Sequence, residues 1–146
     1  MASVDETDLV ASLRIEFIEE SDGSAVPAQL SDATRRWMRE LTAAGVMQSW
    51  IAEGDDGTIG VVTVRIRDAS PREDDLLGKE AYVHNLYVRA PHRRGGVGRA
   101  LMDALLYWCR ANGYTRVALR ASAMGRPLYE RLGFVADRAM VYKAKK

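Results

Sequence analysis

The chain has 146 residues, 47% of them hydrophobic, which is enough for a single domain with a sizeable core over residues 1–146. Its formal net charge of +1 gives no overall electrostatic reason to expect nucleic acid or a membrane as a partner. The sequence shows no apolar run near about 18 residues and no basic N-terminus followed by an apolar stretch, so we expect no membrane span, no secretory signal and a cytoplasmic protein.

The N-terminal third predicts a strand followed by a helix. Residues 1–8 are polar and are expected to be flexible. Residues 13–18 alternate apolar and polar side chains, which predicts a first strand with one face inward. Pro27 and Gly45 then bound a stretch with helical apolar spacing, which predicts a helix between them.

A hairpin and an acidic loop follow. Residues 47–53 and 59–67 flank the turn-rich Gly54-Asp55-Asp56-Gly57, which predicts two antiparallel strands. The second strand is expected to be half exposed, because three β-branched side chains on one face alternate with polar ones on the other: Val62, Val64 and Ile66 against Thr63, Arg65 and Arg67. Residues 68–80 contain proline, glycine and a run of acidic side chains, and they predict a mobile loop.

The second half predicts a strand, a helix and another strand, at residues 82–88, 97–110 and 115–121. The single cysteine, Cys109, lies on the apolar stripe of that helix and is expected to be a buried structural thiol. One cysteine and two scattered histidines make no zinc site, so no metal cofactor is expected.

The C-terminal segment predicts a short helix and two terminal strands. Pro127 suits the start of the helix and Gly133 its end, and residues 134–135 and 138–142 are expected to close the sheet. Antiparallel hairpin strands combined with a strand-helix-strand crossover indicate a mixed α/β fold. Terminal strands exposed at a sheet edge are compatible with a homodimer.

The most informative stretch is Arg93-Arg94-Gly95-Gly96-Val97-Gly98-Arg99, between the predicted central strand and the amphipathic helix. Three glycines permit positive φ and a close approach of the main chain to a ligand. The first N–H groups of the helix lack intrahelical acceptors and stabilise anions, and guanidinium groups beside them can pair with phosphate oxygens. The stretch therefore predicts a phosphate site, with a solvent-facing basic turn as the alternative that composition alone leaves open.

Two other glycine-rich phosphate motifs do not fit these residues. A dinucleotide fingerprint requires a third glycine at the position of Leu101. It also requires an acidic residue roughly 20 positions further on, and the end of the next predicted strand has no acidic residue. A nucleoside-triphosphate loop requires Gly-Lys-Ser or Gly-Lys-Thr, which does not follow the glycines.

The pattern Arg93-x-x-Gly96-x-Gly98, after Asn85-Leu86-Tyr87-Val88, resembles the acyl-CoA pyrophosphate loop of the GCN5-related N-acetyltransferase (GNAT) family. The later Leu128-Tyr129-Glu130-Arg131-Leu132-Gly133-Phe134 is similar to that family's closing Leu-Tyr-Glu-x-Leu-Gly-Phe signature. The resemblance is clear over residues 81–134. It implies a mixed, mostly antiparallel sheet with a splayed parallel strand pair, acetyl-CoA as co-substrate, and direct acetyl transfer to a primary amine in a ternary complex.

The resemblance also implies roles for particular residues. The pyrophosphate is expected at the main chain of residues 94–99, with help from Arg93 or Arg94, and Tyr129 is expected to protonate the departing thiolate. Pantetheine is expected to lie along the strand residues Leu86, Tyr87 and Val88. The backbone N–H of Leu86 or of Val88 is expected to polarise the thioester carbonyl. Two weaker cofactor candidates are Ser122 and Arg126. The base that takes the amine proton is either Glu80 or His84.

Other interpretations stay open at this point. The same fold is compatible with a non-catalytic acyl-CoA-binding domain, and the arginines around residues 89–99 with a nucleic-acid patch, although interleaved aromatic residues are absent. The acceptor is not identified by any motif. The acidic loop at residues 68–80 favours a cationic amine, while a merely solvated loop explains the same charges.

Overall fold

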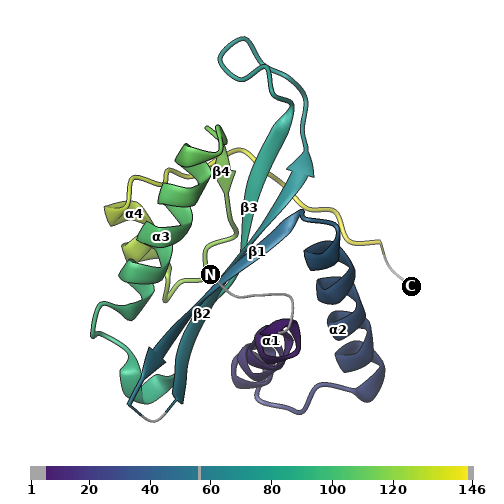
Figure 1. Cartoon of the computed structure of the whole chain (residues 1–146), viewed down its shortest axis with the longest axis vertical. Helices are drawn as coiled ribbons and strands as arrows, with labels where there is room; N and C mark the ends of the chain where they lie inside the picture. The colour runs from purple at the N-terminus through teal and green to yellow at the C-terminus, as the bar shows by residue number, and fades with distance from the viewer. Residues whose placement is uncertain (1–5, 56, 145–146) are drawn as a thin grey trace.

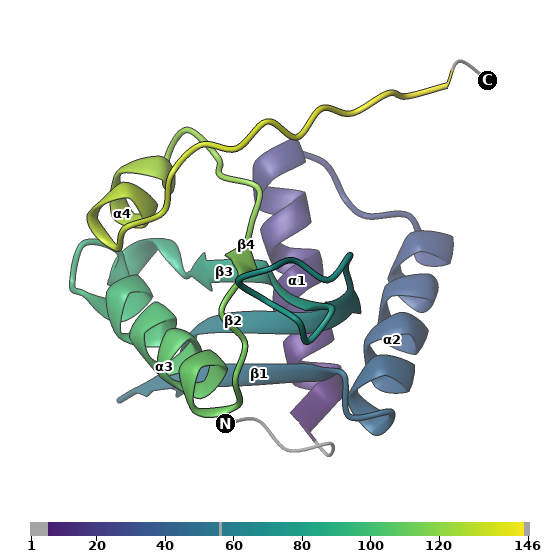
Figure 2. The same cartoon turned by 90° about the horizontal axis from the view of Figure 1, so that it is seen from above.

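A four-stranded mixed sheet separates two helical layers in the computed structural model, which describes residues 6–55 and 57–144. Two helices cover one face of the sheet and two lie on the other (Figures 1 and 2). The first pair comprises α1 (Thr7–Asp22) and α2 (Ala28–Ala43), and the second comprises α3 (Val97–Ala111) and α4 (Arg126–Arg131). The strands are β1 (Met47–Gly54), β2 (Gly57–Asp68), β3 (Lys79–Val88) and β4 (Val117–Ala118). The predicted mixed α/β fold is confirmed.

The strands pair in chain order. β2 is antiparallel to both β1 and β3, and β4 is parallel to β3. The parallel pair is very short: it joins Ala81 to Val117 and Tyr82 to Ala118, and the two strands then diverge. β3 continues to Val88, and within the described residues β4 does not accompany it beyond Tyr82. The edge of β3 after Tyr82 therefore has no paired strand on this side among the described residues.

The predicted first strand at residues 13–18 is wrong, because these residues lie inside α1. Val10, Leu13 and Phe17 recur at spacings of three and four, and Val10 and Leu13 pack with Met38 and Tyr87 in one apolar cluster. The six-residue alternation is a part of this helical stripe. α1 ends at Gly23, which adopts the left-handed conformation with φ of 72°.

The predicted N-terminal flexibility concerned residues 1–8. Residues 1–5 lie outside the described part of the chain, and α1 begins at Thr7.

The hairpin of β1 and β2 is confirmed, but the expected exposure of β2 is wrong at its centre. Thr63 is fully buried, because α1 and α2 cover the face on which it lies. Its hydroxyl is paired at 2.8 Å with that of Ser49 on β1. The other face of β2 packs under α3, where Val62 and Val64 join the second apolar cluster. β2 is therefore buried on both sides in the middle of the sheet.

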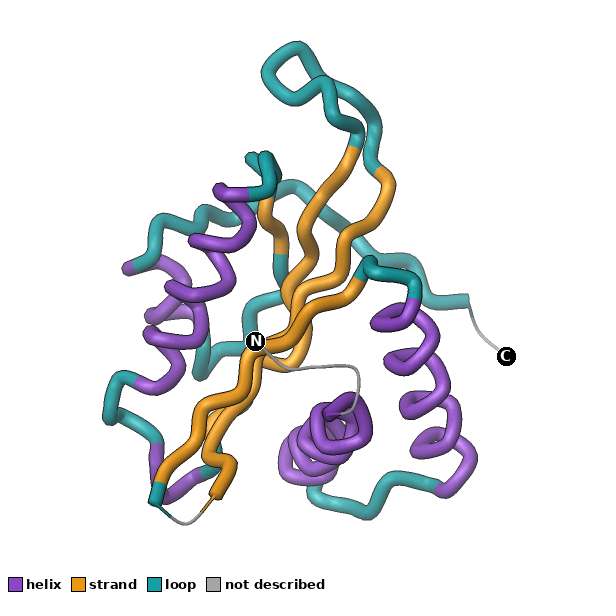
Figure 3. Tube along the Cα trace, in the orientation of Figure 1, coloured by secondary structure: helices purple, strands orange, loops and turns teal. Residues whose placement is uncertain are grey.

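The loop between β2 and β3 projects from one end of the sheet, as Figure 3 shows. It is closed at its base by the backbone N–H of Ala69, which donates to the carbonyl of Gly78 at 2.9 Å. Its acidic side chains at residues 73 and 74 are exposed.

The two predicted terminal strands do not form: the described residues after α4 contain no strand. The outer edge of the sheet is the two-residue β4, which offers almost no ladder for another strand to join. Val135, Met140 and Tyr142 are consequently 88–95% exposed. The expectation of a homodimer was based on these strands and stays a prediction. Among the described helices, none has both the length and the apolar character that crossing a membrane requires.

Candidate active site

The glycine-rich turn presents a row of free backbone donors at the end of β3. After a short 3-10 helix at Ala90–His92, Arg94 and Gly96 adopt positive φ values of 66° and 85°, and α3 begins at Val97. The first N–H in this region with an internal acceptor is that of Ala100, which donates to the carbonyl of Gly96 at 3.0 Å. The six N–H groups of residues 94–99 have no partner among the described residues. Such a row at the positive end of a helix dipole suits an anion.

The arginines of this turn differ from one another. Arg93 is half-buried and held by two partners: its Nε donates to the carbonyl of Val88 at 2.8 Å, and its Nη2 pairs with Glu20 of α1 at 2.7 Å. Arg94 is exposed, and Arg99 makes a surface contact with Asp103 at 3.4 Å. Arg93 therefore fixes the position of the turn against α1, which leaves Arg94 as the exposed guanidinium beside the free N–H groups.

Gly60 lets α3 approach the sheet closely. A Cβ at Gly60 of β2 would lie 3.1 Å from the carbonyl oxygen of Tyr87 and 3.3 Å from side-chain atoms of Val97 and Leu101. A Cβ at Gly98 or at Gly95 would make only ordinary contacts, 3.5 Å from Leu128 of α4 and 3.7 Å from the carbonyl oxygen of His92 respectively. The contact at Gly60 involves residues far apart in sequence and had no signal in the sequence alone.

β3 carries a bulge at Asn85. Thr63 and Val61 of β2 are two residues apart, yet they pair with His84 and Tyr87, which are three apart. The extra residue is Asn85, with φ of 57°, a conformation that asparagine tolerates better than most residues. The bulge therefore directs both His84 and Asn85 towards the α1 and α2 side and reorients the backbone of the next residues.

The three residues predicted to run beside pantetheine follow this bulge. Leu86 and Val88 pack against the apolar cluster under α3. Tyr87 faces the opposite way: it stacks on Phe17 with ring centroids 5.5 Å apart, and burial together with Glu16 and Glu20 raises its pKa. The side chain of Tyr87 thus anchors α1, and only its backbone is available to a ligand beside the strand.

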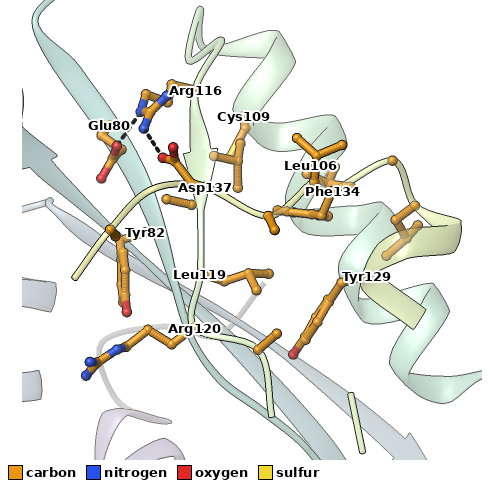
Figure 4. Close-up of a pocket in the computed structure, with 18 of the residues that line it drawn as sticks. Glu80, Tyr82, Leu106, Cys109, Arg116, Leu119, Arg120, Tyr129, Phe134 and Asp137 are labelled. Atoms are coloured by element: carbon orange, nitrogen blue, oxygen red, sulfur yellow. Dashed lines mark hydrogen bonds and ion pairs between the residues drawn. The ribbon is translucent and has the colours of Figure 1, made fainter. Parts of the chain in front are cut away.

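Tyr129 of α4 lines a pocket between α4 and the segment that follows β4. Figure 4 shows its hydroxyl pointing into this pocket, on the side of Leu119 and Arg120. Its ring is 9% exposed and meets Phe134 edge to face at 5.9 Å. Burial raises the pKa of Tyr129, so the hydroxyl keeps its proton at neutral pH. A protonated phenol in this position is able to donate a hydrogen bond or a proton.

Glu80 lies at the centre of a buried ion-pair network. Its carboxylate accepts hydrogen bonds from Arg67 of β2 at 2.7 Å and from Arg116 at 2.6 Å, and Arg116 also reaches Asp137 (Figure 4). Burial by itself would raise the pKa of Glu80, but the bonds from Arg116 and Arg67 outweigh it and lower that pKa below its usual value. Both carboxylate oxygens are occupied, and the network links β2, β3 and the C-terminal segment.

His84 lies on the opposite side of β3 from the α3 core. Its ring meets Trp37 edge to face at 5.5 Å and lies 4.7 Å from the ring of Tyr82. Its Nε2 is buried and has no hydrogen-bond partner among residues 6–55 and 57–144. Burial, reinforced by the positive charges of Arg14, Arg65 and Arg67, lowers the pKa of His84 to about 4. His84 is therefore neutral at physiological pH, with a nitrogen free to accept or donate.

The two weaker cofactor candidates make local contacts in the segment before and within α4. The hydroxyl of Ser122 accepts a hydrogen bond from the N–H of Gly125 at 3.1 Å, and Arg126 pairs with Glu130 at 2.9 Å. Both are exposed, and of the two Arg126 lines the pocket that contains Tyr129. Cys109 is buried as predicted, and burial raises its thiol pKa to about 11.

The fold and the sequence have clear relatives. The model of the acetyltransferase (GNAT) family matches residues 10–134. Human N-acetyltransferase 8 is 32% identical over 111 residues, which are 72% of this chain and 44% of that protein; the chain spans less than half the length of the curated relatives it matches.

Two solved structures share the architecture over nearly the whole chain. A GCN5-related N-acetyltransferase from Ralstonia eutropha is 26% identical with a TM-score of 0.85, covering 98% of this chain and 95% of its own. A predicted acetyltransferase from Clostridium acetobutylicum, solved with acetyl-CoA, is 22% identical with a TM-score of 0.87, covering 98% of this chain and 92% of its own. The chain belongs to the GNAT acetyltransferase family.

Proposed function

We propose that this chain transfers the acetyl group of acetyl-CoA to a primary amine by direct attack of the amine in a ternary complex. The observation that carries the proposal is the continuity between the edge of β3 that β4 leaves after Tyr82 and the free N–H groups of residues 94–99. A long ligand with a pyrophosphate at one end and amides along its arm fits such a path.

The cofactor positions follow from this path. The pyrophosphate lies on the N–H groups of residues 94–99, with the exposed Arg94 beside it and Arg93 holding the turn through Val88. The pantetheine amides continue the hydrogen-bonding ladder of β3 at Leu86 and Val88. A backbone N–H of one of these two residues donates to the thioester oxygen as negative charge develops on it. Arg126 contributes, in this proposal, at the rim of the pocket that contains Tyr129, and Ser122 contributes from the exposed segment before α4.

The chemical step moves two protons. The amine nitrogen attacks the thioester carbonyl carbon, a C–N bond forms, the C–S bond breaks, and the CoA thiolate takes a proton from the Tyr129 hydroxyl. A thiol has a reference pKa near 8.5 and a phenol near 10, so this transfer costs about 2 kcal/mol before local tuning. Before attack, the amine gives up the extra proton of its ammonium form by way of a group near the bulge. The second proton, which the nitrogen loses when the amide forms, returns through solvent to the tyrosine.

Of the two candidates for that group, we favour His84. Its Nε2 is unpartnered, whereas both oxygens of Glu80 are engaged by Arg67 and Arg116. Glu80 serves in this account as the structural centre of its ion-pair network.

The proposal is tested by measuring free thiol released from acetyl-CoA with a broad panel of primary amines, together with calorimetric binding of acetyl-CoA. Amine-dependent thiol release with formation of the N-acetyl product supports the proposal. Binding of acetyl-CoA without thiol release from any amine indicates a non-catalytic acyl-CoA-binding domain of the same fold.

A further inference from the structure

Two guanidinium groups converge on one indole ring, on the side of the sheet that α1 and α2 cover. The Cζ atoms of Arg14 from α1 and Arg65 from β2 lie 5.8 Å and 5.9 Å from the ring centroid of Trp37 in α2. The ring of His84 meets the same indole. We call Arg14, Arg65, Trp37 and His84 the indole cluster. It combines residues from two helices and two strands, so it is a product of the tertiary fold.

The two cations of the indole cluster have no carboxylate partner among the described residues. Other arginines near the sheet do: Arg67 and Arg116 bind Glu80, and Arg89 binds Glu16. Burial lowers the pKa of Arg14, as expected for a guanidinium that is withdrawn from water. A partly buried positive charge without a counterion is costly, so this pair is suited to receive an anion from outside the chain.

Unpartnered polar atoms are concentrated at the same place. The buried side-chain atoms without a hydrogen bond in the described part of the chain are Arg65 Nε, His84 Nε2 and Asn85 Nδ2. Asn85 is only 5% exposed, and its amide orientation is fixed because Arg14 donates to its Oδ1. Its NH₂ group is therefore a buried donor without an acceptor, and so is the Nε of Arg65. Buried donors of this kind are unfavourable unless oxygen acceptors from outside the chain satisfy them, and an anionic ligand group supplies such acceptors.

We propose that the amine acceptor carries an anionic group, a carboxylate or a phosphate, which Arg14 and Arg65 bind beside Trp37 and Asn85. This inference rests on the proposed acetyl transfer and names its acceptor class. It replaces the expectation of a cationic acceptor that was based on the acidic loop at residues 68–80, whose acidic side chains at residues 73 and 74 are exposed.

The position of the indole cluster limits the distance between the anion and the amine. Asn85 directly precedes Leu86, one of the two residues whose N–H is proposed to hold the thioester oxygen. An anion held at Asn85 leaves room for a short spacer before the attacking nitrogen. Amino acids and aminoalkyl phosphates have this arrangement, whereas a simple alkylamine leaves the guanidinium pair without a partner.

Matched acceptors test the inference by thiol release. The carboxylate comparison sets glycine, β-alanine and phenylalanine against their primary amides, and the phosphate comparison sets phosphoethanolamine against ethanolamine. In one of the two comparisons we expect kcat/KM to be at least tenfold higher for the anionic acceptor than for its neutral counterpart. Arg65→Met should reduce that advantage at least fivefold by raising KM for the anionic acceptor. The control is Arg36→Met, on the exposed surface of α2, which should leave the advantage unchanged. Equal turnover of acids and amides, or an advantage that survives Arg65→Met, overturns the inference.

Product binding separates this inference from the proposed function. Calorimetry with N-acetylphenylalanine, N-acetylphenylalaninamide and N-acetylphosphoethanolamine, each in the presence of CoA, reports the anion site without turnover. Tighter binding of an anionic product that is lost in Arg65→Met supports the anion site even if no amine releases thiol, in which case only the catalytic proposal fails. Equal thiol release with anionic and neutral acceptors, together with equal binding of the acid and amide products, contradicts the anion site but not the proposed acetyl transfer.

Discussion

The guanidinium of Arg14 donates a hydrogen bond to the side-chain oxygen of Asn85, the residue that bulges from β3. α1 is thereby tied to the point where the backbone of β3 is reoriented. Asn85 is held at φ of 57° by its place in the sheet and by this bond. The residue after it is a proposed thioester donor, so the contact links the packing of α1 to the geometry of the reaction.

Substitution of Asn85 separates the backbone contribution from that of the side chain. Asn85→Gly removes the hydrogen bond to a charged group but allows positive φ, and we expect it to lower the free energy of unfolding by about 2 kcal/mol. Asn85→Ala loses the same bond and adds left-handed strain, for about 1 kcal/mol more. Urea unfolding monitored by circular dichroism measures both. Equal stability of the two variants contradicts the strained bulge.

Substitution of Gly96 tests whether the glycine-rich turn binds the pyrophosphate. Because Gly96 has φ of 85°, alanine at this position should carry a conformational strain of about 1 kcal/mol. The resulting shift of the free N–H groups should weaken acetyl-CoA binding at least fivefold. Gly45→Ala is the matched control, because Gly45 has a similar φ of 76° at the end of α2 and a Cβ there would meet nothing within 4 Å. Calorimetric titration with acetyl-CoA should distinguish the two. Similar losses of affinity in both variants indicate a general effect of destabilisation.

Tyr129→Phe should lower kcat at least tenfold and leave the affinity for acetyl-CoA nearly unchanged. The substitution keeps the ring that packs on Phe134 and removes only the hydroxyl that points into the pocket. Tyr107→Phe serves as the control, since Tyr107 is 70% exposed on α3. Steady-state kinetics of thiol release and calorimetric binding give the two quantities. An unaltered kcat removes Tyr129 from the role of acid.

His84 should stay neutral at pH values well below the usual pKa of histidine. With the pKa lowered from 6.5 to about 4, the unfolded chain binds a proton at higher pH than the folded chain. Stability from this group is therefore complete above about pH 6.5 and is lost as the pH falls towards about 4. Ring-proton NMR, assigned with His92→Gln, measures the titration directly. Stability measured from pH 7 to pH 4 should fall less steeply in His84→Phe, and titration of His84 near 6.5 contradicts the account.

Glu80→Gln should affect stability more than the proton transfer. Loss of the carboxylate leaves Arg67 and Arg116 without their shared partner. Both side chains are about one-third exposed, so solvent screens part of the loss, and we expect the free energy of unfolding to fall by about 2 kcal/mol at neutral pH. The lowered pKa means that this stabilisation is present above about pH 4.5 and is lost at lower pH, so the variant and the wild type should converge there. Loss of a limb in the pH profile of kcat/KM would instead make Glu80 the base.

The sequence predicted those parts of the site that depend on local patterns. The turn at Gly96 and the amphipathic helix after it, the hairpin, and the short helix with Tyr129 all have strong local signals, and the structure contains each element. The alternation at residues 13–18 was misleading because six residues do not distinguish a strand from one part of a helical stripe. A longer window, from Val10 to Phe17, contains the helical spacing.

The remaining differences come from contacts that no local pattern reveals. Thr63 is buried because α1 and α2 cover its face of β2. The guanidinium of Arg93 is paired with Glu20, which is far away in sequence, and not left free beside the N–H groups of the glycine-rich turn. The bulge at Asn85 and the indole cluster arise only when helices and strands pack together. The described residues after α4 form no strand, and β4 has only two residues.

Release of CoA thiol from acetyl-CoA by the purified chain, with mass-spectrometric detection of the N-acetylated amine, tests the central claim most directly. We expect thiol and N-acetyl product in equal amounts, dependent on the amine and strongly reduced in Tyr129→Phe. Tight binding of acetyl-CoA with no amine-dependent thiol release across the panel contradicts it.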